Sequence, residues 1–132
     1  MMKMQQILLI DDDPIMNFIN GKITASVFAD SEIVVLVNGL DALEHIRTNP
    51  ENQYLVFLDI NMPVMNGWEF LEALSEDPFP YRLSIHLLTS SVDLADKSKA
   101  QGSRMVLSYI VKPLTRAVLA DIAASAANGG LH

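Results

Sequence analysis

Carboxylates stand at two points of this chain where a short apolar run ends. The run "ILLI" is followed by Asp11, Asp12 and Asp13, and the run "YLVFL" is followed by Asp59. Carboxylates brought within a few ångströms repel one another, and the arrangement is costly unless a cation neutralises them. Oxygen ligands from carboxylates, a carbonyl and retained water suit Mg²⁺ better than zinc or copper. The aspartates therefore predict a Mg²⁺ site, provided that the fold brings the two points together.

A hydroxyl and an ammonium group follow two further apolar runs. Thr89 follows "LSIHLL", and Lys112 follows "LSYIV". They would supply a hydrogen-bond donor and a point charge for a phosphate whose oxygens complete the shell of a partly hydrated Mg²⁺. Singly, each group has an ordinary explanation: Asp13 as a helix cap, Thr89 as a helix start, Lys112 as a surface charge. Because four runs end in complementary groups and only the run at 32–37 ends in none, the combination indicates phosphoryl transfer.

The apolar runs predict the strands of one parallel sheet. They are near-continuously apolar rather than alternating, which is typical of strands buried on both faces. The predicted strands span 6–10, 32–37, 54–58, 83–88 and 107–111. The segments between them are long enough for crossover helices, so the predicted fold class is α/β with a doubly wound five-stranded parallel sheet. With strand order 2-1-3-4-5, the first and third strands adjoin at the topological switch point, where ligands bind.

Helix signals occupy each gap between these runs. Asp13 and Pro14 form a cap and first turn, followed by apolar residues at helical spacing, namely Met16, Ile19, Ile23 and Val27. Asn38 can cap a second helix, whose Leu40, Leu43 and Ile46 are predicted to face inward. Three more helices are predicted at 66–75, 91–101 and 114–125.

The composition is that of an ordinary globular domain. Its 132 residues are half apolar and 19% charged, which predicts one domain at 1–128 and a short tail at 129–132. A net charge of −7 argues against nucleic-acid binding, and the lack of cysteine excludes thiol nucleophiles and disulfides. The opening is too short for a secretory signal core, and no run approaches the roughly 20 apolar residues of a membrane span. We therefore expect a cytoplasmic protein that does not contact a membrane.

The sequence resembles the receiver domain of two-component response regulators over essentially its whole length. The matching segments are "LLIDDDP", "FLDINMPVMNGWEFL", "LLTSS" and "YIVKPLT", in the order of that family and close to its spacing. The resemblance implies a flavodoxin-like (βα)5 fold, similar to that of the single-domain chemotaxis regulator. It also implies a signalling phosphoacceptor that catalyses only its own phosphorylation and dephosphorylation.

The resemblance assigns roles to individual residues. Asp59 matches the phosphoacceptor, Lys112 the lysine that pairs with the phosphoryl group, and Thr89 the switch hydroxyl that moves toward it. Besides Asp59, the matched Mg²⁺ ligands are Asp12, Asp11 through a water molecule, and the backbone carbonyl of Asn61. Tyr109 matches the aromatic switch on the face made by the fourth helix, the fifth strand and the fifth helix. The bond before Pro113 matches one that is typically cis in the family.

The family resemblance implies protein partners. A histidine kinase would donate the phosphoryl group, and a downstream effector or a histidine phosphotransfer protein would receive the signal or the group. The domain would be a monomer or a weak, phosphorylation-dependent dimer. In the family, the positions of Asn61 and Ser91 tune dephosphorylation; since neither is bulky here, we expect a phosphoryl lifetime nearer minutes than days.

Two other functions stay open on the sequence. Asp11 and Asp13 form a strand-end DxD pair, as in small phosphatases of the haloacid dehalogenase type, where Asp11 would be the nucleophile. That interpretation leaves "DINMPVMNG" unexplained. The other is a degenerate receiver that binds its partner regardless of phosphorylation, although every matched acidic, threonine and lysine position is present.

Overall fold

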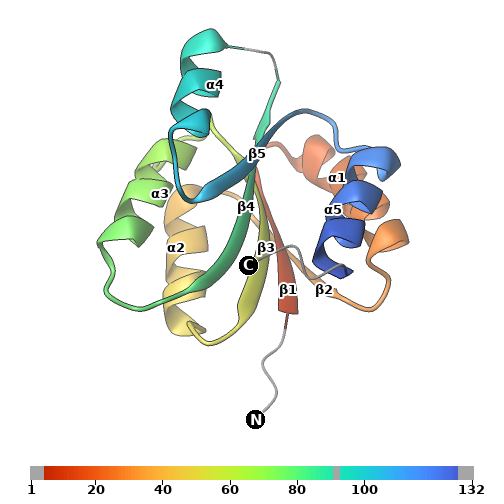
Figure 1. Cartoon of the computed structure of the whole chain (residues 1–132), viewed down its shortest axis with the longest axis horizontal. Coiled ribbons are helices and arrows are strands. Elements are labelled where there is room, and N and C mark those ends of the chain that lie inside the picture. Colours follow the sequence, from red (N-terminus) through yellow and green to blue (C-terminus); the bar gives the residue numbers. More distant parts are fainter. Residues whose placement is uncertain (1–4, 91–92, 128–132) are drawn as a thin grey trace.

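Five parallel strands form one sheet in the order β2-β1-β3-β4-β5, as predicted (Figure 1). A computed structural model of the chain describes residues 5–90 and 93–127. The elements are β1 (Gln5–Ile10), α1 (Pro14–Val27), β2 (Glu32–Leu36), α2 (Gly39–Thr48), β3 (Gln53–Asp59), α3 (Gly67–Glu76), β4 (Arg82–Thr89), α4 (Leu94–Gln101), β5 (Val106–Val111) and α5 (Arg116–Ala127). None of the helices in these ranges is long and apolar enough to cross a bilayer.

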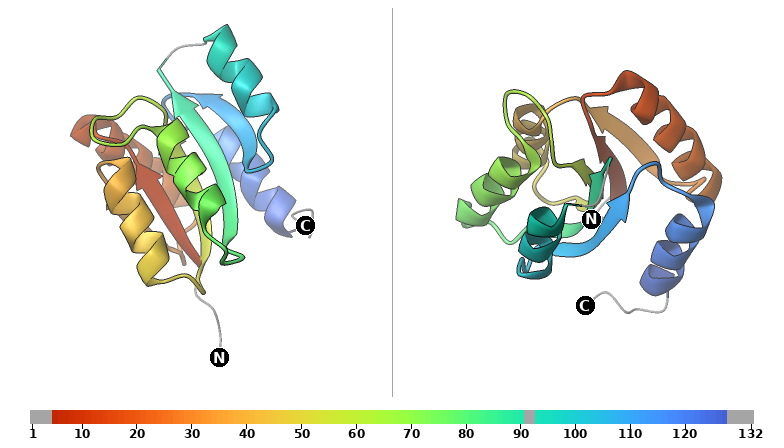
Figure 2. Two further views of the ribbon diagram at one scale, coloured as in Figure 1. Left: turned by 90° about the vertical axis from the view of Figure 1, so that its left-hand side faces the viewer. Right: turned by 90° about the horizontal axis from the view of Figure 1, so that it is seen from above.

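Helices cover both faces of the sheet, which explains why the strands are apolar on both sides. On one face, the second and fourth apolar residues of β1, Leu8 and Ile10, pack in a core with α2, α3 and α4. On the other face, their neighbours Ile7 and Leu9 pack in a second core with α1 and α5. The two helical layers are separated by the sheet in the views of Figure 2. Alternation therefore places successive residues in different cores, and both cores require apolar side chains.

The predicted helix caps are formed. The Asp13 carboxylate accepts from the backbone N–H of Ile15 at 2.9 Å, and the amide oxygen of Asn38 accepts from that of Asp41 at 2.8 Å. Asn66, predicted as the first residue of a helix, is instead the cap of α3 and forms a capping box with Glu69.

The helix boundaries and inward faces differ in places from the prediction. Leu40 is 40% exposed, so its predicted inward orientation is wrong. The reason is the close packing of Gly39, where an added Cβ would lie 2.6 Å from the backbone oxygen of Met65. Gly39 thus belongs to the buried stripe of α2 with Ala42, Leu43 and Ile46, and Leu40 lies beside that stripe. The first two residues of the fourth predicted helix, Ser91 and Val92, and the tail at 129–132 lie outside the described residues.

The residues that α1 buries are also not all the apolar residues that its sequence spacing predicts. Ile23 and Val27 pack in the second core, but Ile19 is 39% exposed. The buried positions of α1 are polar: Asn17, Asn20 and Thr24.

Candidate functional site

The carboxyl ends of β1 and β3 bring the two groups of aspartates together. Carboxylate oxygens of Asp11, Asp12 and Asp59 all lie within 4.8 Å of one another. Asp11 is 2% exposed and Asp59 is 4% exposed, whereas Asp12 is exposed. Asp13 caps α1 instead, as its ordinary explanation predicted. The cluster is therefore two buried carboxylates with a third at the solvent side.

Lys112 extends from the end of β5 into the carboxylate cluster. Its Nζ donates to Asp11 Oδ2 at 2.9 Å and lies 3.3 Å from Asp59 Oδ1. Burial alone would lower the pKa of Lys112, but the hydrogen bond and charges of the two aspartates outweigh it and raise that pKa. The ammonium is thus held in its charged form between two carboxylates.

The donor set fits a divalent cation. Three carboxylates against one ammonium leave an excess of two negative charges at the end of the sheet. Oxygen donors with an open, solvent-facing side are the environment that Mg²⁺ favours, because it retains several waters. Asp11 is engaged through both oxygens, since its Oδ1 accepts from the Asp13 N–H at 3.0 Å. Asp12 and Asp59 are the carboxylates better placed for direct contact with an ion.

Burial raises the pKa of Asp59 from its ordinary 3.8 to about 6, with the neighbouring Asp11 charge as the second cause. The positive charge of Lys112 opposes this shift, as do hydrogen bonds to the carboxylate from Lys112 and from the backbone N–H of Asn61. A raised pKa in the folded state means that the folded protein binds this proton more tightly than the unfolded chain does. In the absence of metal, this contribution to stability is complete below about pH 4 and is lost as the pH rises through about 6.

We therefore expect the metal-free protein to lose more stability between about pH 4 and pH 7 than its Asp59→Asn variant loses. With allowance for solvent screening, the difference in the free energy of unfolding should be about 1–2 kcal/mol. Urea unfolding in chelator at both pH values measures it. Equal pH dependence in the two proteins would show that Asp59 titrates normally.

The loop after Asp59 closes tightly onto the strand that carries it. The N–H of Gly67 donates to the carbonyl of Ile60 at 2.8 Å. An added Cβ on Gly67 would lie 2.8 Å from the backbone oxygen of Asp59, so only glycine fits there. Asn61 lies exposed in this loop, two residues beyond Asp59.

The two predicted switch residues lie on neighbouring strands beside the cluster. Thr89 is the last residue of β4 and is 3% exposed, and its carbonyl accepts from the N–H of Lys112 at 2.7 Å. Tyr109 lies on β5, half-buried against the core under α4. Its hydroxyl accepts from the N–H of Asp93, the cap of α4, at 3.4 Å.

Ser91, the residue predicted to tune the phosphoryl lifetime, lies outside the described residues. The bond between Lys112 and Pro113 is cis.

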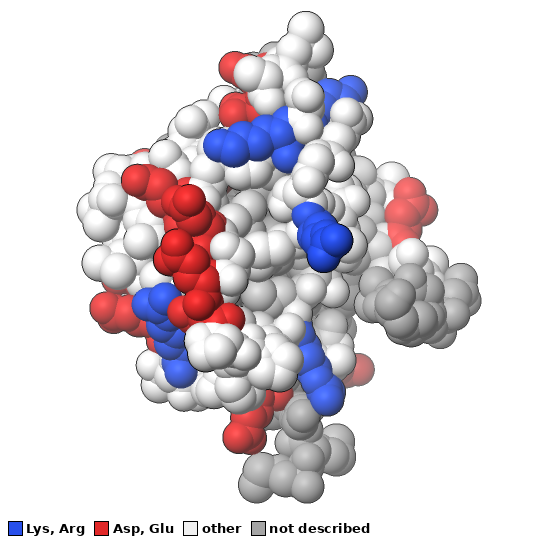
Figure 3. Space-filling model, turned by 60° about the vertical axis from the view of Figure 1, so that its left-hand side comes forward, with Lys and Arg blue, Asp and Glu red and all other residues white. Residues whose placement is uncertain are grey.

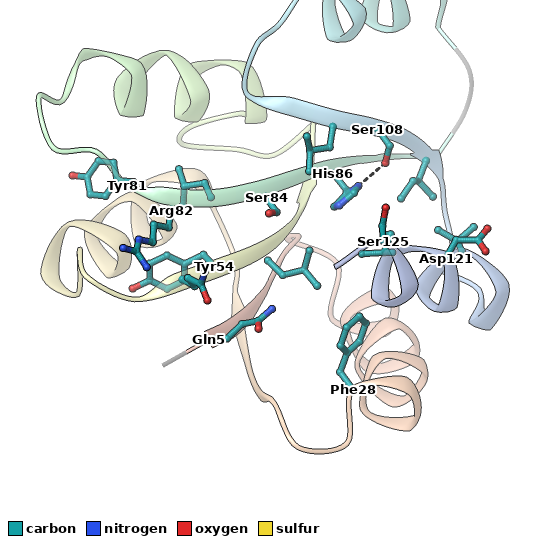
Figure 4. A pocket seen from close by; sticks show the side chains of 17 residues that line it. Gln5, Phe28, Tyr54, Tyr81, Arg82, Ser84, His86, Ser108, Asp121 and Ser125 are labelled. Atoms are coloured by element: carbon teal, nitrogen blue, oxygen red, sulfur yellow. Dashed lines mark hydrogen bonds between the residues drawn. The ribbon is translucent and has the colours of Figure 1, made fainter. Parts of the chain in front are cut away.

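A cavity lies beside β4, β5 and α5 and extends to the starts of the strands (Figure 4). It has a volume of about 1020 Å³, and its lining includes the first residues of three strands, Gln5, Gln53 and Arg82. His86 lies in it, with Nδ1 2.6 Å from Ser108 Oγ, and burial lowers the pKa of His86 to about 4. The cavity holds none of the carboxylates of the cluster, so it does not serve the predicted chemistry.

Sequence reasoning missed two side chains near the cluster. Asn17 donates through Nδ2 to the backbone carbonyl of Asp11 at 2.8 Å, and Asn20 accepts through Oδ1 from the N–H of Leu114 at 3.0 Å. Two amides three residues apart just after the acidic turn were the available signal.

The sequence and the fold both have counterparts among known proteins. The model of the response regulator receiver domain matches residues 7–124. The chain belongs to this family. A two-component response regulator from Cytophaga hutchinsonii has a similar solved structure, with TM-score 0.82 and 32% identity, covering 96% of this chain and 99% of that one. One from Legionella pneumophila gives TM-score 0.77 and 26% identity over 93% of this chain and 98% of that one.

Curated relatives of the receiver are of several lengths. Chemotaxis protein CheY1 of Helicobacter pylori is 29% identical over 88% of this chain and 91% of its own length. A protein-glutamate methylesterase/protein-glutamine glutaminase of Desulfotalea psychrophila is 33% identical over 95% of this chain. The receiver spans only 34% of the length of that methylesterase. Hybrid signal transduction histidine kinase L of Dictyostelium discoideum is 29% identical, and the receiver spans 8% of its length. Receivers of this kind therefore occur both nearly alone and as parts of longer proteins.

Proposed function

We propose that this receiver accepts a phosphoryl group on Asp59 from a histidine kinase and signals through protein contacts. The observation that carries the proposal is Lys112, whose Nζ reaches both Asp11 and Asp59 at the open end of the sheet. A carboxylate beside a fixed cation and an excess of negative charge is suited to metal-assisted phosphoryl transfer.

In the transfer step, a carboxylate oxygen of Asp59 forms a bond to phosphorus. The bond from phosphorus to the imidazole nitrogen of the donor breaks, and its electron pair returns to the ring. Lys112 faces the developing charge on the phosphoryl oxygens, and the Thr89 hydroxyl turns to the same group as the switch. A Mg²⁺ ion held by Asp12, Asp59, the Asn61 carbonyl and, through water, Asp11 would neutralise the carboxylates and the phosphoryl oxygens.

The haloacid dehalogenase alternative has less support. It needs Asp11 as a free nucleophile, but both oxygens of Asp11 are engaged by Lys112 and the Asp13 N–H. Its second aspartate, Asp13, is the cap of α1.

The donor would approach over α1. Asp12 is the exposed member of the cluster, and the following helix exposes two large apolar side chains, Ile15 at 71% and Phe18 at 66%. Exposed apolar side chains beside a reactive group suit the docking of another protein.

The signalling contact would use the α4-β5-α5 face. Leu94, Leu107 and Val111 are 80%, 54% and 45% exposed there. Tyr109, on β5 between Leu107 and Val111, connects this face to the cap of α4 through its hydroxyl. By contrast, the side that carries α2 and α3 shows a band of acidic side chains (Figure 3), which supports the expectation that nucleic acid is not a partner.

The direct test of the proposed function is incubation with acetyl phosphate and Mg²⁺. We propose that the protein gains one acid-labile phosphoryl group and that chelator prevents this. Protein that stays unmodified with Mg²⁺ present would reject the phosphoacceptor function.

The metal site can be tested separately with two neighbouring aspartates. Asp12→Asn is expected to weaken Mg²⁺ binding by at least about tenfold, because it removes a charged ligand from the cluster. Asp13→Asn makes the same charge change one residue away and keeps the helix cap, since asparagine caps as well as aspartate. It should bind Mg²⁺ nearly as the wild type does. Titration calorimetry measures the Mg²⁺ affinity of both variants. Equal losses of affinity would mean that only the overall charge matters.

A further inference from the structure

The buried face of α1 is built from polar side chains where apolar ones would be expected. Asn17, Asn20 and Thr24 are 7%, 1% and 0% exposed. Their spacing places them on one face of the helix. Burying an amide costs free energy that its hydrogen bonds only roughly offset, whereas an apolar side chain gains from burial. Stability alone therefore does not account for two amides at these positions.

Each amide holds a backbone group of a segment that ends in the phosphoacceptor site. The bond from Asn17 Nδ2 to the carbonyl of Asp11 is 2.8 Å long, and the carboxylate of the same residue belongs to the cluster. The bond from the Leu114 N–H to Asn20 Oδ1 is 3.0 Å long, two residues after Lys112. Both are buried, so water does not compete for them.

The segment that carries Lys112 is held on two sides. At Lys112 itself, the backbone N–H donates to the Thr89 carbonyl at 2.7 Å. Just after it, Asn20 holds Leu114. The lysine side chain is a four-carbon stem of finite reach, so its ammonium can stay between the two carboxylates only while its backbone is held near them.

We infer that Asn17 and Asn20 are positioning residues of the phosphoacceptor site. From one face of α1 they fix the backbones of Asp11 and of the segment after Lys112. The ammonium thereby stays between Asp11 and Asp59. The inference rests on the proposed function in that it assigns the two amides to the same reaction.

The test compares Asn20→Leu with a control on the same helix face. Leucine branches at Cγ as asparagine does, although it is larger, and it offers no acceptor, so phosphorylation by acetyl phosphate with Mg²⁺ should be roughly ten- to a hundredfold slower. Thr24→Val is the control, because Thr24 Oγ1 is buried without a hydrogen-bond partner in the described part of the chain. It should keep the wild-type rate. Both proteins are assayed well below their unfolding temperatures.

Two readouts separate positioning from general damage. In a Lys112→Ala background, Asn20→Leu should slow the reaction by less than about twofold, because residues that act together are not additive. In the background with Lys112 intact, acetic anhydride should modify the Lys112 amine several times faster in Asn20→Leu than in the wild type. Exposed Lys22 is the internal reference in peptide mass spectrometry.

Failure of the inference can be told from failure of the proposed function. If the wild type is phosphorylated and Asn20→Leu reacts at the same rate, or is slowed equally in both backgrounds, the positioning role is overturned. If the wild type is not phosphorylated, the proposed function fails, and unchanged acetylation of Lys112 in Asn20→Leu would then overturn the positioning role independently.

Discussion

Asp59→Asn protein incubated with acetyl phosphate and Mg²⁺ is expected to gain no acid-labile phosphate. The amide oxygen of asparagine is neutral and a poor nucleophile, and an acyl phosphate cannot form on it. Since the other two carboxylates of the cluster remain, the variant keeps most of the site but loses the acceptor. Mass spectrometry of the intact protein, with and without mild acid, measures the result, which should be complete loss rather than a reduced rate.

The same experiment distinguishes the alternatives. Phosphate gained by Asp59→Asn would place the acceptor elsewhere. Continuous release of phosphate from an aryl phosphate, lost in Asp11→Asn but kept in Asp59→Asn, would favour the haloacid dehalogenase type. A partner that binds equally to the wild type, to Asp59→Ala and to the protein treated with beryllofluoride would favour a phosphorylation-independent module.

Lys112→Met is expected to separate Mg²⁺ binding from phosphoryl transfer. Without the ammonium, no fixed positive charge repels the ion or offsets the carboxylates, so Mg²⁺ should bind roughly tenfold more tightly at a pH well above the pKa of Asp59. The reaction with acetyl phosphate should nonetheless be about a hundredfold slower, because a fixed charge facing the transferring group is lost. Calorimetry measures the first effect, and the rate at saturating Mg²⁺ measures the second.

Lys99→Met is the matched control for this change. Lys99 is an exposed lysine of α4 whose Nζ lies 4.6 Å from the centroid of the Trp68 ring, far along the chain from the cluster. The Lys99→Met substitution removes one positive charge from the protein without changing any contact of the carboxylates. If both lysine variants altered Mg²⁺ affinity equally, net charge rather than Lys112 would be responsible. A normal rate in Lys112→Met would remove Lys112 from the proposed reaction.

The strands and their order followed from local pattern. Each predicted strand overlaps the observed one with ends that differ by at most one residue, because a strand packed in two cores needs apolar side chains along its length. The position of Asp59 at the last residue of β3 follows from the same run. Since the ends of parallel strands share one edge, the meeting of Asp59 with Asp11 was predictable once the order was assumed.

The orientation of helices was less predictable. Leu40 looked like a core residue at helical spacing, but the buried face of α2 begins with Gly39, which packs against the Met65 backbone, and leaves Leu40 outside it. Similarly, Ile19 belongs to an apolar series and is 39% exposed, while Asn17 and Asn20 are buried. Spacing identifies residues on a common face, but the partner elements decide which face is covered.

The sequence by itself determined the α/β class, the parallel strands and the acidic, hydroxyl and ammonium groups at their ends. These depend on side-chain type and on contacts near in the chain, which a local pattern records. Only the tertiary structure decided that Lys112 pairs with Asp11 across the sheet, and that Asn20 holds the segment after it. Those contacts join residues about a hundred positions apart, and they exist because β1 and β5 end, and α1 begins, at one edge of the fold.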